Sequence, residues 1–318
     1  MALLRSAPLL VLAACGLGAS PGGGSDNLPS GGTGPYAKLS DVSLETLIDE
    51  PFVIFELAAD VAEPAAIALD GDTYRLWYSR TLRTPPGAAT EIWTADLPAS
   101  LTVPPETTGL ALRADQPFEG GRVAAPSVVR DGDRLVMFYE AGTDLVARAV
   151  STDDGATWTK EGMVLTDARA PSAVIVDGSW LVYATRPSAP GIFVARSADG
   201  VSFSWEPEPV LAPTGFGLDG TTVGSPGAYA EITPAGQTRV WLFYPASGQD
   251  EDGPLSGVAY AGSEDGITFT RGGRGAPVLV PASAEDRSTA PIIGHAGSVM
   301  FYGGTRANVR AIGAARTP

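Results

Sequence analysis

Two glutamates occupy positions from which a carboxyl group could take part in acid–base chemistry. Glu63 directly precedes Pro64 at the start of an apolar segment, and Glu140 directly follows Tyr139 at the end of another. We expect Glu63 and Glu140 to be the catalytic acid and base pair, and burial at the strand end would raise the pKa of Glu140 and suit it to donate a proton. An ion pair between Glu140 and a neighbouring arginine is the alternative.

Arginines near the ends of similar apolar segments form a second set of candidates. Arg80, Arg186 and Arg306 lie at comparable places in three repeats. Together they could bind a carboxylate or sulfate group by forked hydrogen bonds, or each could form a separate surface salt bridge. Asp219 is a further candidate for substrate binding. The loops predicted on the same face carry charged residues: Asp60, Arg122, Asp167, Arg169, Asp219 and Arg287.

The chain offers little for metal or thiol chemistry. His295 is the only histidine and Cys15 the only cysteine, so a site built on histidine ligands or on an internal disulfide is not expected. His295 and Glu231 both align with the first turn of a repeat, which places them on the face opposite the candidates above. We predict no metal site and no cofactor.

One motif recurs five times and indicates the architecture. Each copy opens with a proline, in the pairs Glu63-Pro64, Ala125-Pro126, Ala170-Pro171, Ser225-Pro226 and Ala290-Pro291. A short apolar strand, a tight turn and a strongly apolar return strand follow the proline. A third strand, rich in small residues, would let neighbouring sheets approach closely. The repeat therefore predicts a set of similar small sheets.

A tyrosine recurs near the end of each return strand. These residues are Tyr78, Tyr139, Tyr183, Tyr244 and Tyr302. Stacking on a sugar ring is one explanation, but recurrence at one position of the repeat favours packing in the core.

Three repeats carry a turn of the pattern Ser-x-(x)-Asp-Gly followed by an aromatic residue. The turns span residues 151–158, 197–203 and 263–269, and the first matches the Asp-box pattern of sialidases and other propellers. In such a turn, serine and aspartate side chains accept hydrogen bonds from turn amides, glycine adopts a positive φ, and the aromatic residue packs into the blade. We expect a structural role for all three turns.

These patterns predict an all-β fold, a five-bladed β-propeller formed by residues 37–318. The last repeat ends without a fourth strand, and residues 51–55 resemble the outer-strand segments at 209–211 and 277–279. We therefore predict that residues 51–55 pair with the last blade and close the ring, which also covers an exposed sheet edge. In this geometry, the start of each first strand and the end of each second strand surround one axial cavity.

The repeat from about residue 51 to residue 316 resembles the catalytic domain of glycoside hydrolase families 43 and 32. The resemblance implies a carboxylate before the first proline and further acidic residues in the next two blades. Glu63 occupies the first position, but Ala125 and Ala170 occupy the other openings. The resemblance thus implies a carbohydrate-related propeller with Glu63 at the first site. Glu140, at a strand end that faces the predicted cavity, is the candidate for the second carboxyl group that hydrolysis requires.

The main expectation is a glycosidase-like protein that binds a glycan, with or without hydrolysing it. Two other functions are alternatives. The alanines at the second and third openings favour a non-catalytic binding or scaffold propeller on the cell surface. A sialidase-type enzyme that acts on anionic sugars is the third reading. Nucleic acid is not expected as a partner, because the net charge is −15 and the acidic residues are scattered. We expect a monomer.

The N-terminal residues predict export and lipid attachment. Residues 1–14 have the positive start and apolar run of a signal peptide, which ends in Leu12-Ala13-Ala14 directly before Cys15. This sequence resembles the bacterial lipobox, so we predict lipidation of Cys15 and anchoring to the bacterial cell envelope, at the outer membrane or cell surface. Residues 15–36 are rich in Gly, Ser and Pro and would form a flexible tether.

Overall fold

The computed structural model describes residues 36–39, 52–70, 72–101, 105, 107–233, 236–273, 276–279, 289–294, 297–306 and 308–316. The predicted signal peptide, Cys15, Arg287 and His295 lie outside these residues, as does nearly all of the predicted tether. Within the described part of the chain, no helix is long and apolar enough to cross a membrane.

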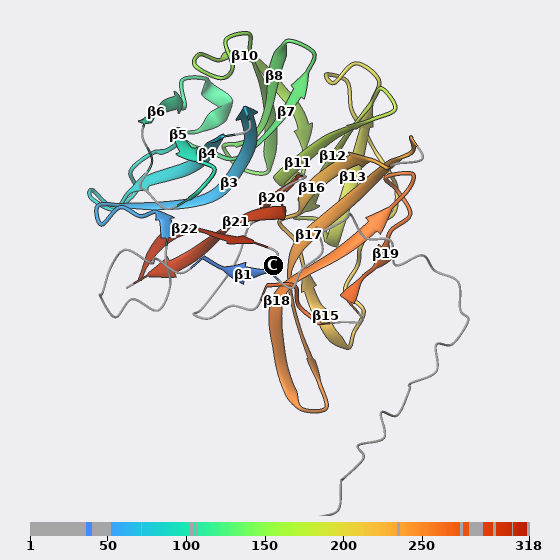
Figure 1. Cartoon of the computed structure of the whole chain (residues 1–318). Helices are drawn as coiled ribbons and strands as arrows, with labels where there is room; N and C mark the ends of the chain where they lie inside the picture. Colours follow the sequence, from blue (N-terminus) through green and yellow to red (C-terminus); the bar gives the residue numbers. More distant parts are fainter. Residues whose placement is uncertain are drawn as a thin grey trace, which may run out of the picture.

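The strands form five antiparallel sheets that are arranged as a five-bladed β-propeller, which confirms the predicted fold class (Figure 1). Blade 1 contains β3 (Ala59–Asp70), β4 (Thr73–Leu82), β5 (Thr90–Pro98) and β6 (Thr107–Leu112). Blade 2 contains β7 (Val123–Asp131), β8 (Arg134–Ala141), β9 (Leu145–Ser151) and β10 (Thr159–Thr166). Blade 3 contains β11 (Arg169–Val176), β12 (Ser179–Arg186), β13 (Ala189–Ser197) and β14 (Ser204–Trp205).

The last two blades are less regular than the first three. Blade 4 contains β15 (Gly217–Val223), β16 (Gly227–Ile232), β17 (Thr238–Asp250), β18 (Gly253–Ser263) and β19 (Thr270–Arg271). Blade 5 contains β20 (Thr289–Gly294), β21 (Gly297–Arg306) and β22 (Val309–Arg316), together with β1 (Ala37–Lys38) and β2 (Phe52–Ile54). One short 3-10 helix, η1 (Pro117–Glu119), precedes blade 2.

The N-terminal strand closes the ring, as the sequence predicted. Phe52 of β2 lies opposite Gly313 of β22, and Ile54 lies opposite Ile312. The side chain of Ile54 is buried in an apolar cluster with Tyr78 and Phe301. Blade 5 therefore combines strands from both ends of the domain.

Five apolar clusters fill the five interfaces between neighbouring blades. The recurrent tyrosines of the second strands lie in these clusters, and all five are at most 1% exposed. This burial confirms the prediction that they pack in the core. Small side chains such as Ala149 and Ala261, on the third strands, are also fully buried and let adjacent sheets approach.

The three Ser-Asp-Gly turns contain the predicted hydrogen bonds. In the first turn, Oγ of Ser151 accepts a hydrogen bond from the amide of Gly155 at 2.8 Å. Asp153 accepts bonds from the amide and hydroxyl of Thr157 at 2.9 and 2.6 Å. The turns at Asp199 and Asp265 repeat this arrangement, and each turn glycine has a positive φ.

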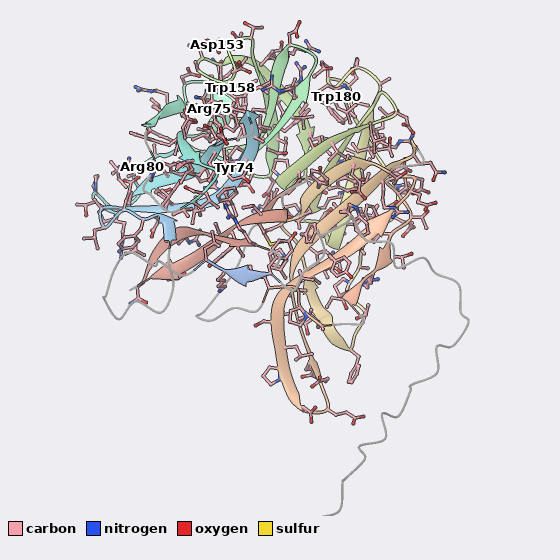
Figure 2. All side chains as sticks on the ribbon, viewed as in Figure 1. Tyr74, Arg75, Arg80, Asp153, Trp158 and Trp180 are labelled. Carbon is pink, nitrogen blue, oxygen red and sulfur yellow. The ribbon has the colours of Figure 1, made fainter. Side chains whose placement is uncertain are left out.

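The aromatic residue of each turn packs between blades and not only within its own blade. Trp158 of blade 2 meets Trp77 of blade 1 edge to face, with 5.8 Å between ring centroids. Phe203 and Phe269 make similar contacts with Phe138 and Tyr183 of the preceding blades. Figure 2 shows Asp153 at the upper edge of the molecule and Trp158 below it. Each turn thus joins two blades.

Blade 4 departs from the regular repeat. β17 continues for six residues beyond Tyr244, near which the predicted return strand would end, and forms a long hairpin with β18 (Figure 1). β15 pairs with the additional part of β17, where Val223 lies opposite Ala246 and Gly217 lies opposite Gln249. This blade therefore extends past the others on the side where the first strands begin.

Candidate functional site

The openings of the first four repeats surround one axial cavity of about 340 Å³. All five blades contribute to its wall. Blades 1 to 4 contribute the prolines and the residues around them, and blade 5 contributes residues 303–305 and Arg310. The charged residues of the lining are Glu63, Glu140, Arg169 and Arg310. The predicted convergence is thus present for four of the five proline-containing starts, and the side chains of the fifth, at residues 290–291, lie outside the described part.

The residue before each of these four prolines has a left-handed backbone. The φ angles are 56° for Glu63, 45° for Ala125, 49° for Ala170 and 43° for Ser225. This conformation is uncommon for residues with a Cβ and costs about 1–2 kcal/mol each. In blades 1 to 3 it coincides with a β-bulge at the proline. A bulge redirects a side chain, and in blade 1 that side chain is Glu63.

Glu63 is held by a short chain of hydrogen bonds that begins in blade 2. The amide of Ala125 donates to Oγ of Ser79 at 2.8 Å, and the hydroxyl of Ser79 donates to Oε2 of Glu63 at 2.5 Å. The same amide also lies 3.2 Å from Oε2 of Glu63. Ser79 is buried. These donors fix the orientation of the carboxylate.

Glu140 is held in a comparable way between blades 2 and 3. Its Oε1 accepts a hydrogen bond of 2.7 Å from the amide of Ala170. Its Oε2 forms an ion pair of 2.7 Å with Arg122, so the alternative interpretation of Glu140 is also present in the structure. The Glu140 side chain is only 12% exposed, and it still contributes to the cavity wall. The two predicted catalytic carboxylates therefore share one cavity.

Ser79 is the residue of this site that the sequence prediction missed. It follows Tyr78 as Glu140 follows Tyr139, and both side chains accept a hydrogen bond from the residue before the next proline. Alignment of the two repeats at their tyrosines would have identified it. Two further serines, Ser127 and Ser172, line the cavity and accept amide hydrogen bonds from Ala173 and Ala228 of the next blade.

The predicted cluster of arginines does not form at the cavity. Arg80 pairs with Glu56 at 2.7 Å and stacks over Trp93. Arg186 pairs with Asp167 at 2.9 Å and stacks over two aromatic rings. Neither residue lines the cavity, because a carboxylate and aromatic faces retain each guanidinium on its own blade. The side chain of Arg306 lies outside the described part.

Two other arginines line the cavity instead. Arg169 pairs with Asp144, whereas the exposed side chain of Arg310 forms no ion pair within the described residues. Asp60 accepts a hydrogen bond from the backbone amide of Arg310 at 2.9 Å. Arg310 was not a sequence candidate, because it lies on a third strand, a part of the repeat that was expected to pack between sheets.

Asp219 and Glu231 lie outside the cavity lining. Asp219 forms an ion pair with Arg271 and accepts a hydrogen bond from the hydroxyl of Thr214 at 3.0 Å, so it stabilises its own loop. Glu231 accepts a hydrogen bond from Nε1 of Trp241 near the first turn of blade 4. Within the described ranges, no three potential metal ligands among His, Cys, Asp and Glu come together.

No family model and no curated protein matches this chain. Solved structures do match. A glycosyl hydrolase from Bacteroides ovatus has a TM-score of 0.67 at 16% identity, with 91% of this chain and 95% of that chain covered. A structure from glycoside hydrolase family 130, whose hydrolases target β-1,2 mannosidic linkages in Candida mannan, has a TM-score of 0.69 at 16% identity and covers 91% and 95%.

A family 117 glycoside hydrolase from Zobellia galactanivorans is similar as well, with a TM-score of 0.61 at 16% identity and coverage of 88% and 89%. This propeller shares its fold with glycoside hydrolases. At such low identity the likeness establishes the fold alone, and the resemblance to families 43 and 32 in particular is not established by it. Function depends on the side chains that line the cavity and not on the fold.

Proposed function

We propose that this protein is a glycoside-hydrolase-like propeller that binds a glycan in its axial cavity. The observation that carries the proposal is the presence of Glu63 and Glu140, from adjacent blades, on one cavity lined by all five blades. Each carboxylate is oriented by a backbone amide of the next blade and retains lone pairs for sugar hydroxyl groups. The small residues Ala125 and Ala170 leave the space that a sugar ring needs.

Hydrolysis of the bound glycan is the second candidate function. It is favoured by the same pair of carboxylates, because glycoside hydrolysis commonly uses two of them, one as acid and one as base or nucleophile. Hydrolysis needs one of the two carboxyl groups to supply a proton, whereas glycan binding needs no proton donor. Binding is therefore the primary proposal.

A panel of polysaccharides and aryl glycosides tests both functions. We expect the wild-type protein to bind at least one glycan, and Glu63→Gln and Glu140→Gln to weaken that binding at least tenfold. Glu264→Gln is the matched control, since Glu264 is 72% exposed and lies in a turn outside the cavity. Turnover lost in both cavity variants would identify an enzyme, and binding without turnover would identify a non-catalytic receptor. Binding unchanged in both variants would refute the proposal.

We also propose that the protein is attached to the bacterial cell envelope through a lipid on Cys15. The support is the sequence Leu12-Ala13-Ala14-Cys15 behind a short apolar run. Labelling of cells with radioactive palmitate tests this proposal. We expect label in the wild-type protein and none in Cys15→Ser, together with a shift of that variant from the membrane to the soluble fraction.

A further inference from the structure

We propose that Phe216 forms a second sugar-binding surface beside the axial cavity, for a glycan unit next to the one that the cavity holds. This inference rests on the proposed function and deepens it. Phe216 is 60% exposed and is the only aromatic residue among the exposed large hydrophobic side chains of the described chain. A single exposed apolar side chain is common on a protein surface, so the case for a ligand rests on where Phe216 lies and on how its loop is held.

The topology of blade 4 places Phe216 at the end of a wall that rises from the cavity. β15 begins directly after Phe216 and ends at Val223, two residues before Ser225 of the cavity lining. β16 is the innermost strand of the blade, and β15 continues its line along the same side of β17. Gly217 pairs with Gln249, three residues beyond the Val223–Ala246 pair. At ~3.4 Å per residue the wall extends about 10 Å.

Several interactions hold the loop that presents Phe216. The hydroxyl of Thr214 lies 2.8 Å from the carbonyl oxygen of Phe216 and 3.0 Å from Oδ1 of Asp219, and these two acceptors share its one hydrogen. The amides of Thr214 and Gly215 donate to the carbonyl oxygens of Asp219 and Gly220, at 3.1 and 3.0 Å. Asp219 pairs in turn with Arg271 of β19. The loop is thus organised before a ligand arrives.

Close packing against the hairpin adds to this rigidity. A Cβ at Gly248 of β17 would overlap the carbonyl oxygen of Gly217 and the amide nitrogen of Gly220. The loop is therefore seated directly on the backbone of β17. A side chain presented by a pre-organised loop loses little conformational freedom on binding, so more of its contact energy contributes to affinity.

The chemistry of the exposed ring indicates the ligand. A phenyl face is flat and apolar, and it matches the C–H face of a pyranose ring, whose hydroxyl groups remain in water. The cavity supplies carboxylates and serines for hydroxyl groups, whereas Phe216 supplies only apolar area. We therefore expect Phe216 to favour longer oligosaccharides over monosaccharides.

Binding of labelled glucose-, mannose-, xylose- and galactose-based oligomers of one to four units tests the inference. We expect Phe216→Ala to weaken the tetramer of the bound sugar about five- to tenfold, which corresponds to roughly 1–1.4 kcal/mol, and to leave the monomer unchanged. Phe216→Trp should retain tetramer affinity. Ile232→Ala is the control, because Ile232 is 78% exposed at the first turn of the same blade.

The outcomes separate this inference from the proposed function. Tetramer binding unchanged in Phe216→Ala, with binding lost in Glu63→Gln, would overturn the role of Phe216 and leave the cavity proposal standing. Equal weakening of monomer and tetramer in Phe216→Ala would also overturn it, because the residue would then act on the cavity itself. A wild-type protein that binds no glycan of any length would refute both.

Discussion

The hydroxyl of Ser79 donates a hydrogen bond of 2.5 Å to Oε2 of Glu63. Ser79 belongs to the second strand of blade 1, and its oxygen also accepts the amide hydrogen of Ala125 in blade 2. One buried side chain thus orients the candidate carboxylate and joins two blades. The site and the ring therefore depend on the same hydrogen bonds.

We predict that Ser79→Ala lowers the free energy of unfolding by about 1–3 kcal/mol, because it removes a buried acceptor and a charge-assisted donor. Glycan affinity should fall as well, since Glu63 then keeps only the longer bond from Ala125. Urea unfolding and glycan titration measure the two effects. Ser79→Thr retains the hydroxyl and serves as the control. An unchanged affinity in Ser79→Ala would contradict the positioning role.

Glu140 should matter for stability as well as for binding. We expect Glu140→Ala to lower the free energy of unfolding by about 2–3 kcal/mol, because both the Ala170 amide and the Arg122 guanidinium lose their partner. Glu140→Gln keeps an acceptor for the amide and should cost about 1 kcal/mol. Denaturant titration of both variants measures this difference. Equal losses of stability in the two variants would show that the hydrogen bond from the Ala170 amide contributes nothing.

The glycine of the first Ser-Asp-Gly turn cannot be replaced without strain. Gly155 has a φ of +86°, and a Cβ there would overlap the ring of Trp77. We expect Gly155→Ala to cost about 2–5 kcal/mol, from backbone strain and overpacking together. Gly132→Ala is the matched control, with a φ of +61° and open space, and should cost about 1–2 kcal/mol. Thermal unfolding of both variants measures these costs. Equal losses of stability in the two variants would refute this account.

The turn aspartates should make stability depend on acid pH. Hydrogen bonds from the amide of Ser202 and the hydroxyl of Ser197 lower the pKa of Asp199 to about 2, from 3.8. A carboxylate with a lowered pKa stabilises the fold above about pH 4, and this contribution disappears as the pH falls through 2. Asp199→Asn should therefore have a lower Tm than the wild type at pH 6, and the gap should vanish near pH 2.

Thermal scans from pH 7 to pH 2 measure this dependence. Asp133→Asn is the control, because Asp133 is exposed and lies outside the three turns. The other two turns should behave in the same way, since hydrogen bonds also lower the pKa of Asp153 and, against desolvation, that of Asp265 to about 2. A constant difference in Tm between wild type and Asp199→Asn across the whole range would show that the charge of Asp199 is not involved.

The sequence predicted the fold well, because the same physical pattern is repeated five times. Each copy shows its proline, its return strand and its tyrosine, so a weak signal gains weight by recurrence. The closing strand could be predicted because residues 51–55 resemble outer strands and the last repeat lacks one. Glu63 and Glu140 could be predicted to share one cavity because strand ends converge at one face of a propeller.

Contacts between side chains could not be predicted in the same way. Arg80 pairs with Glu56 and does not line the cavity. This partner depends on which residues are neighbours in three dimensions, and no local sequence pattern encodes that. β15 escaped prediction because its sequence, Gly-Leu-Asp-Gly-Thr-Thr-Val, lacks regular alternation of apolar and polar residues. The left-handed backbone at Ala125 and Ala170 also runs against the usual preference of a residue before proline.

The pairing of β2 with β22 sets an order on folding. Ile54 meets Ile312 across the ladder, so 258 residues of chain must emerge after the first strand before its partner exists. Until then, β2 is an unpaired apolar segment that a chaperone or a second nascent chain could bind. The final blade is therefore the stage at which this protein is most open to misassembly.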